Sequence, residues 1–206
     1  MIWHTPSEHT VDGKHYDAEA QVVNADANGN EAAVIGIFFD KSAGAADNDW
    51  MKSFMDGYND RFNPDANAKK KVDMSLLLKP LAEEKGYWMY DGSLTEPDCV
   101  EGIAWTVMKD VQRISQTQLD WLFRFTKGAA EGDELNATEQ KYLDYVKTNT
   151  ANENNGAGNN RKTQPLGDRK IYMFHAHDHD HDHDHDAASG LMASAAALAA
   201  ITLLSF

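Results

Sequence analysis

The chain has 206 residues, which is enough for one domain or two small ones. Hydrophobic residues make up 42% of it, a share that suits a globular core. The formal net charge of −14 argues against nucleic acid as a partner, because proteins that bind nucleic acid are usually basic.

The first 24 residues, MIWHTPSEHTVDGKHYDAEAQVVN, combine strand and turn signals with several imidazoles and carboxylates. The dipeptide Asp12–Gly13 predicts a tight turn between two short extended segments. Histidine and carboxylate side chains gathered on one hairpin are what a metal site and its supporting hydrogen bonds need. The sequence therefore predicts a polar site in this hairpin, with the members His4, Glu8, His9, Glu19 and Gln21.

The next segments alternate between strand and helix signals. The apolar run AAVIGIFF at residues 32–39 predicts a buried strand. Over Trp50–Arg61, aromatic and methionine side chains recur at helical spacing, which predicts an amphipathic helix whose aromatic stripe packs in the core.

The region from Tyr87 onward predicts two strands and a helix. Extended segments are expected at Tyr87–Tyr90 and Val100–Met108, with a turn at Asp91–Ser93 after the first of them. A helix is expected over Ser115–Phe125, with Ser115 as its N-cap.

The C-terminal third contains three segments of unusual composition. Residues 127–160 include a polar, asparagine-rich stretch that predicts a disordered insertion. Residues 175–186, HAHDHDHDHDHD, predict either a site for divalent metals or a solvated acidic spacer. Residues 187–206 are small and apolar, and are compatible with a lipid-anchor signal, a tail anchor, or an ordinary helix or disordered end. The first two alternatives predict attachment to a membrane. In the His-Asp repeat at 175–186, the side chains that could bind a divalent metal are those of His175, His177, His179, His181, His183 and His185.

Two blocks of this sequence resemble the α-class carbonic anhydrases. HTPSEHTVDGKHYDAE at residues 4–19 is similar to the metal hairpin of that family. YWMYDGSLT at residues 87–95, followed by EPDC and VEGIAWTVMK, is similar to a second family block. Weaker echoes are AVIGIFF at 33–39 and RKTQPLGDR at 161–169, in family order. Residues 1–174 are thus identified as an α-carbonic-anhydrase-like domain.

The resemblance implies a mainly β fold, a twisted and largely antiparallel sheet with short peripheral helices. The chain opens within a strand that is central in the family, so we expect the N-terminal strands to be missing. Residues 1–174 would then be the C-terminal two thirds of the family domain, with a polar insertion near 127–160. No signal peptide precedes Met1, although the family context and the tail lead us to expect a secreted or cell-surface protein.

The resemblance also assigns a site. The family binds zinc through three histidines and hydrates CO2 reversibly to bicarbonate, and its ligand positions fall on Ile2, His4 and Gln21. Zinc and CO2/bicarbonate are therefore implied, but only His4 is a histidine. By resemblance, Thr95 and Glu8 are the pair that orients the zinc-bound hydroxide, and His9, Glu19 and Tyr90 support the site. The residues that line the pocket by resemblance are Val23, Val34, Leu94, Glu96, Ile103 and Trp105.

Three hypotheses on function follow from these residues. The first is a carbonic anhydrase by descent whose catalysis is weak or lost, because one zinc histidine of three remains. The second is a non-catalytic, carbonic-anhydrase-related binding module. The third is a surface metal-binding protein that uses its His-Asp tail. The family resemblance implies a lyase, and the two missing zinc histidines imply that its activity is impaired.

Overall fold

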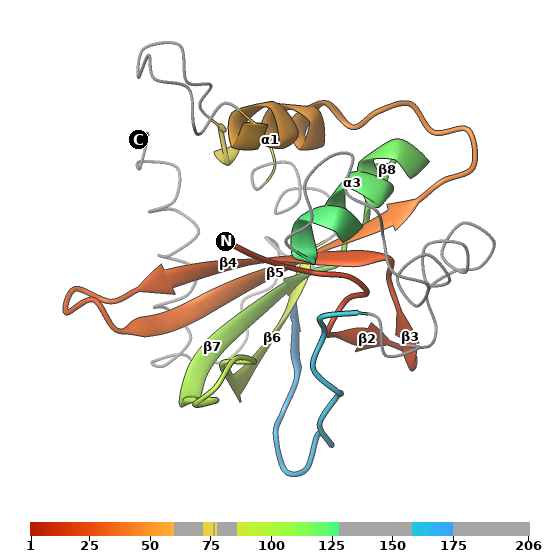
Figure 1. Cartoon of the computed structure of the whole chain (residues 1–206). Helices are drawn as coiled ribbons and strands as arrows, with labels where there is room; N and C mark the ends of the chain where they lie inside the picture. The colour runs from red at the N-terminus through yellow and green to blue at the C-terminus, as the bar shows by residue number, and fades with distance from the viewer. Residues whose placement is uncertain (60–71, 76, 78–85, 128–157, 175–206) are drawn as a thin grey trace, which may run out of the picture. The chain divides into compact units, whose positions relative to one another are not determined.

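The computed structural model describes residues 1–59, 72–75, 77, 86–127 and 158–174 (Figure 1). The predicted His-Asp repeat at 175–186 and the apolar tail at 187–206 lie outside the described residues, as does most of the predicted insertion at 127–160. In the described part, no helix is long and apolar enough to cross a membrane. The elements are, in chain order, β1 (Ile2–His4), β2 (Thr10–Val11), β3 (Lys14–His15), β4 (Ala18–Ala25), β5 (Glu31–Lys41), α1 (Asp49–Asn59), β6 (Tyr87–Ser93), β7 (Glu101–Met108), β8 (Gln112–Ile114), α3 (Gln116–Thr126) and β9 (Tyr172–Phe174).

The fold is mainly β, as predicted. One sheet has the strand order β1-β4-β5-β7-β6-β9, and β8 pairs with β5 beside this path. The pairs β1–β4, β6–β7 and β6–β9 are antiparallel, whereas β5–β8 is parallel, so the sheet is mixed. The strands β2 and β3 form a separate two-stranded ladder.

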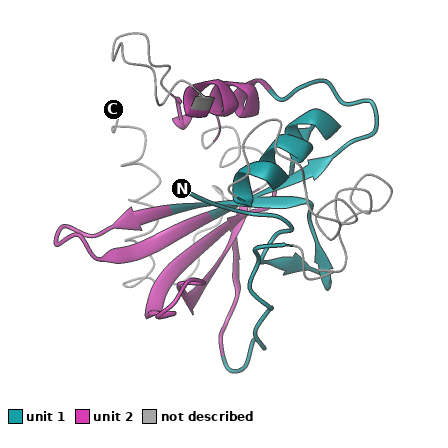
Figure 2. Cartoon of the chain, in the orientation of Figure 1, with its two compact units in different colours: residues 1–22, 36–48, 111–168 teal, residues 23–35, 49–110, 169–206 magenta. Residues whose placement is uncertain are grey.

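Two compact units make up the chain (Figure 2). Unit 1 consists of residues 1–22, 36–48 and 111–168, and holds β1, β2, β3, β8 and α3. Unit 2 consists of residues 23–35, 49–110 and 169–206, and holds α1, β6, β7 and β9. The long strands β4 and β5 each contribute residues to both units.

The local signals in unit 1 produce the predicted elements. Asp12 and Gly13 have φ angles of 52° and 76°, as a tight turn between β2 and β3 requires. The Ser115 side chain accepts a hydrogen bond from the Gln118 N–H while the Gln118 side chain accepts one from the Ser115 N–H, which caps α3. The aromatic rings of Trp3 and Phe39 pack with their centroids 5.0 Å apart in the core.

In unit 2 one prediction is confirmed and another is wrong. The amphipathic helix is present as α1, which ends at Asn59, the last residue described in that stretch. The turn predicted at Asp91–Ser93 is instead the end of β6, where Asp91 pairs with Ala104 and Gly92 with Ile103. A register shift between Gly92 and Ser93 lets the strand continue, and the chain turns only afterwards, where the Leu94 N–H donates to the Val100 carbonyl.

Candidate functional site

The candidate site lies in unit 1, on one face of the antiparallel pair β1–β4. Ile2 is directly opposite Gln21, and His4 is directly opposite Glu19. Side chains of directly opposed residues point to the same face of a sheet, and so do residues two apart on a strand. The pairing therefore places the side chains of all four residues together.

Glu19 is the most completely buried member of this group, with 0% of its surface exposed. Its Oε2 accepts the backbone N–H groups of Glu8 and His9, both at 2.9 Å, and its Oε1 lies 2.7 Å from His9 Nδ1. Burial alone would raise the pKa of Glu19, but the charge and hydrogen bonds of His9 outweigh it and hold the pKa below its ordinary value. Glu19 is thus a buried carboxylate that His9 stabilises.

Gln21 connects this carboxylate to a second one. Its Nε2 donates to Glu8 Oε2 at 2.9 Å and lies 3.3 Å from Glu19 Oε1. Glu8 is buried as well, and its other oxygen, Oε1, accepts the backbone N–H of Arg161 at 2.6 Å. The amide must present its nitrogen to these groups, because an amide oxygen would repel two carboxylates.

His4 has one partnered and one free ring nitrogen. Nδ1 lies 3.3 Å from the carbonyl oxygen of Asn159 and 3.4 Å from Glu8 Oε1. Nε2 is buried and has no hydrogen-bond partner among the described residues. When the ring proton is on Nδ1 and bonds to the Asn159 carbonyl, Nε2 is unprotonated. Its lone pair then accepts no hydrogen bond from a described residue.

Sequence reasoning missed the segment that holds this hairpin in place. The Asn159 side chain accepts the Thr5 N–H at 2.9 Å and donates to the Trp3 carbonyl at 2.8 Å. Its backbone N–H donates to the Thr5 carbonyl at 3.3 Å. Asn159 stands just before the weak echo at 161–169, and no residue pattern distinguishes it from the many neighbouring asparagines.

Zinc, the metal that the family fold implies, does not fit these residues. Ile2 has no donor atom, and the Gln21 amide nitrogen is directed at the two carboxylates. Among the described residues, no group of three or more His, Cys, Asp or Glu side chains is arranged to hold a metal ion. The unpartnered Nε2 of His4 is a single imidazole, whereas catalytic zinc sites use three protein ligands.

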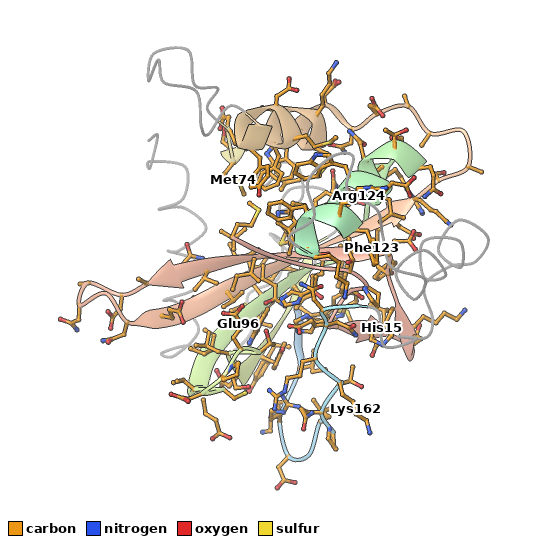
Figure 3. All side chains as sticks on the ribbon, viewed as in Figure 1. His15, Met74, Glu96, Phe123, Arg124 and Lys162 are labelled. Carbon is orange, nitrogen blue, oxygen red and sulfur yellow. The ribbon has the colours of Figure 1, made fainter. Side chains whose placement is uncertain are left out.

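The remaining predicted site residues lie in unit 2. Tyr90 stacks on Trp105, with centroids 6.1 Å apart and planes within 6°, and the Trp105 indole donates to the Ser93 carbonyl at 2.9 Å. Thr95 is half-buried. Glu96 is exposed in the loop after β6 (Figure 3). The roles of Thr95 and Glu8 as an orienting pair and of Tyr90 as a support of the site stay predictions. Of the predicted pocket residues, Val34, Ile103 and Trp105 are buried, and Val23 and Leu94 are half-buried.

Comparison with known proteins identifies the class. The family model of eukaryotic-type carbonic anhydrases matches residues 3–175, so the chain belongs to this family, whose members depend on zinc. The predicted α-carbonic anhydrase type of fold is thereby confirmed.

Individual relatives agree with this assignment. Alpha carbonic anhydrase 4 of Arabidopsis thaliana is 34% identical over 119 residues, which are 57% of this chain and 41% of that protein. Dioscorin dioA3 of Dioscorea japonica is 34% identical over 123 residues, with the same two coverages. A hyperthermostable carbonic anhydrase from a hydrothermal vent chimney superposes with a TM-score of 0.54 at 30% identity, covering 83% of this chain and 60% of that one. The chain thus spans 41% of the length of the two curated relatives.

Proposed function

We propose that this chain is a carbonic-anhydrase-family domain that has kept the family's scaffold and buried polar network but does not hydrate CO2 through zinc-bound hydroxide. One observation supports the proposal above all others. The side chain at the third ligand position, Gln21, donates its amide hydrogens to Glu8 and Glu19, opposite an isoleucine at the first ligand position.

Metal binding here would cost hydrogen bonds. A glutamine can offer a metal only its amide oxygen, a poorer ligand for zinc than imidazole. Rotating the amide so that its oxygen takes the place of the nitrogen and faces a metal would leave Glu8 Oε2 without the Gln21 donor. A buried polar group that loses its partner costs about 1–3 kcal/mol. The network is therefore most stable when no metal is bound.

Such a domain would act as a binding or structural module with the family fold. A second candidate function, divalent-metal binding by the tail, rests on the six histidines that alternate with aspartate or alanine at 175–186. A third, residual CO2 hydration, would require His4 to hold zinc with other ligands.

Zinc content and CO2 hydration separate these candidates. The full chain and a variant with all six tail histidines changed to alanine are purified, zinc is measured by mass spectrometry, and hydration is followed by stopped flow. We expect zinc, if any, to be lost with the tail imidazoles, and hydration to stay at the uncatalysed rate in both. One zinc per chain in the tail variant, with hydration that acetazolamide blocks, would refute the proposal.

A restored ligand set gives the positive counterpart. Ile2→His and Gln21→His together supply three imidazoles, and we expect this variant to bind about one zinc per chain, the stoichiometry of a three-ligand site. Ile2→His alone is the matched control, because it adds an imidazole but leaves Gln21 bonded to Glu8. If the double variant binds no more zinc than the control, the loss of two histidines is not what prevents metal binding.

A further inference from the structure

The strand order of the main sheet ends in β1 on one side and in β9 on the other, and these two edge strands differ. At β1, backbone groups of Trp3 and Thr5 bond to Asn159. At β9, the backbone pairs with β6, and the Phe174 carbonyl oxygen lies 3.4 Å from Lys109 Nζ. No other described residue bonds to the backbone of β9. Among the described residues, the outer edge of β9 is therefore open to a further strand.

Apolar side chains are exposed at this edge. The described residues expose six large apolar side chains, and three of these are the consecutive Ile171, Tyr172 and Met173, with 53%, 38% and 56% of their surfaces exposed. Met173 is directly opposite Trp88 of β6, which is half-buried. Edge strands are commonly protected by a charged residue or a proline within the strand, and β9 has neither. The edge is thus suited to pairing with another strand.

Two cations lie over aromatic rings beside this edge. Lys109 Nζ is 5.3 Å from the centre of the Trp88 ring, and the Arg169 guanidinium carbon is 5.6 Å from the centre of the Tyr90 ring. Trp88 and Tyr90 are two apart on β6, so their side chains share one face of the sheet, and Met173 is on that face because it is opposite Trp88. The exposed Met173 side chain therefore has positive charge near it.

The charge along the chain changes sign at β9. Arg169 and Lys170 come shortly before the strand, after the single acid Asp168. Lys170 is exposed. Directly after Phe174, the sequence continues into the His-Asp repeat at 175–186, which contains five aspartates. Net positive charge thus precedes the strand, and negative charge follows it.

We propose that β9 is a dimerisation edge, at which a second copy of this chain pairs antiparallel, β9 against β9. In antiparallel pairing, the residues that follow Phe174 in one copy run beside the residues that precede Tyr172 in the other. The aspartates of each His-Asp repeat then meet Arg169 and Lys170 of the other copy. The contact is the same on both copies, as a twofold dimer requires. The inference is independent of zinc and of the proposed function.

Charge favours this arrangement over the alternatives. If the two copies paired in parallel, basic residues would face basic residues and the two acidic repeats would lie side by side, and like charges in opposed positions are destabilising. The repeat of the same chain could pair with β9 only by reversing direction directly after Phe174. The next three residues are His-Ala-His, which are not the residues that form tight turns.

The size of the contact sets its strength. A strand of three residues with few exposed apolar side chains makes a small interface, so we expect a reversible dimer instead of a permanent one. The part of the attraction that comes from exposed charges is screened by salt, and the dimer should therefore weaken as the ionic strength rises.

Sedimentation velocity of the full chain between about 1 and 300 μM tests the proposal. Met173→Glu places a negative charge on the pairing edge, and Lys170→Glu reverses a charge that meets the acidic repeat of the other copy. Val100→Glu is the matched control, because Val100 is 54% exposed but lies between β6 and β7, at the end of β6 that β9 does not reach. Urea midpoints of the three variants report whether each one is folded.

We expect the wild type to dimerise with rising concentration, and Met173→Glu and Lys170→Glu to weaken the dimer about tenfold or more, while Val100→Glu leaves it unchanged. A wild type that stays monomeric at every concentration would overturn the proposal. So would a dimer that Met173→Glu and Val100→Glu weaken equally.

Hydrogen exchange of the wild-type chain locates the contact without any variant. The amides of residues 171–174 should exchange more slowly as the concentration rises, because the second copy bonds to them. Exchange at these amides that does not change while the dimer forms would place the contact elsewhere and refute the pairing. Amides that are protected to the same degree in the monomer would show that the edge is already occupied by the same chain, which also contradicts the proposal.

Discussion

The substitution Gln21→Leu removes the amide that connects the two buried carboxylates but keeps a side chain of similar size. Gln21 Nε2 is 2.9 Å from Glu8 Oε2 and 3.3 Å from Glu19 Oε1. Glu19 keeps its bonds from the Glu8 and His9 backbone and from the His9 ring. Among the residues that the structure describes, Glu8 keeps only the Arg161 N–H on its other oxygen and the more distant His4 ring. The loss therefore falls on Glu8.

The magnitude follows from this asymmetry. A hydrogen bond to a charged group contributes about 1.5–3 kcal/mol, and the lost contact to Glu19 adds little because that carboxylate has other donors. We expect Gln21→Leu to lower the free energy of unfolding by about 2–3 kcal/mol, a large part of the 5–15 kcal/mol that is typical of a domain.

Urea unfolding followed by tryptophan fluorescence measures the effect. The matched control is Gln116→Leu, since Gln116 Nε2 also donates to a carboxylate, Asp120 Oδ1 at 2.8 Å, but on the half-exposed surface of α3. There we expect a loss of about 0.5 kcal/mol or less. If the two variants lose the same stability, the buried amide does not compensate Glu8 and the reasoning behind the metal-free network fails.

Two further substitutions test the supports of the two units. Asn159→Ala should lower the free energy of unfolding by about 1–2 kcal/mol, because Thr5 and Trp3 each lose a side-chain partner; an unchanged urea midpoint would show that the 158–161 segment does not hold β1. Gly92→Ala would place a Cβ 2.7 Å from a Tyr90 ring carbon and 2.8 Å from a Trp105 ring carbon, so we expect a loss of about 1–3 kcal/mol in thermal unfolding. If Gly92→Ala unfolds at the wild-type temperature, the stacked Tyr90 and Trp105 rings move aside without loss of stability.

The parts of the fold that the sequence predicts well are those with local causes. The dipeptide Asp12–Gly13 adopts positive φ angles, which suit Asp and Gly because of their own side chains. Ser115 and Gln118 form a capping box, which depends on four consecutive residues. β8 and β9 have three residues each and carry no periodic signal in the sequence. They form because β8 can pair with β5 and β9 with β6. The continuation of β6 through Gly92 depends likewise on its partner strand β7.

The candidate site shows the same division. His4, Glu8, His9, Glu19 and Gln21 were expected together because residue type and family resemblance both indicate them. The sequence does not reveal that Gln21 donates to Glu8, which depends on the register of β1 against β4. Nor does it distinguish Asp17 from the other acids of a chain with 33 Asp and Glu, because only tertiary packing buries it.

The bonds between Thr5 and Asn159 join residues 154 positions apart. During synthesis, the first strand leaves the ribosome long before the asparagine that closes its backbone hydrogen bonds. Bringing together residues so far apart in the chain loses conformational entropy before the native hydrogen bonds form, and this slows folding. Strand β1 is therefore among the last elements to reach its native hydrogen bonds, and the apolar side chain of Trp3 must stay free of aggregation until then.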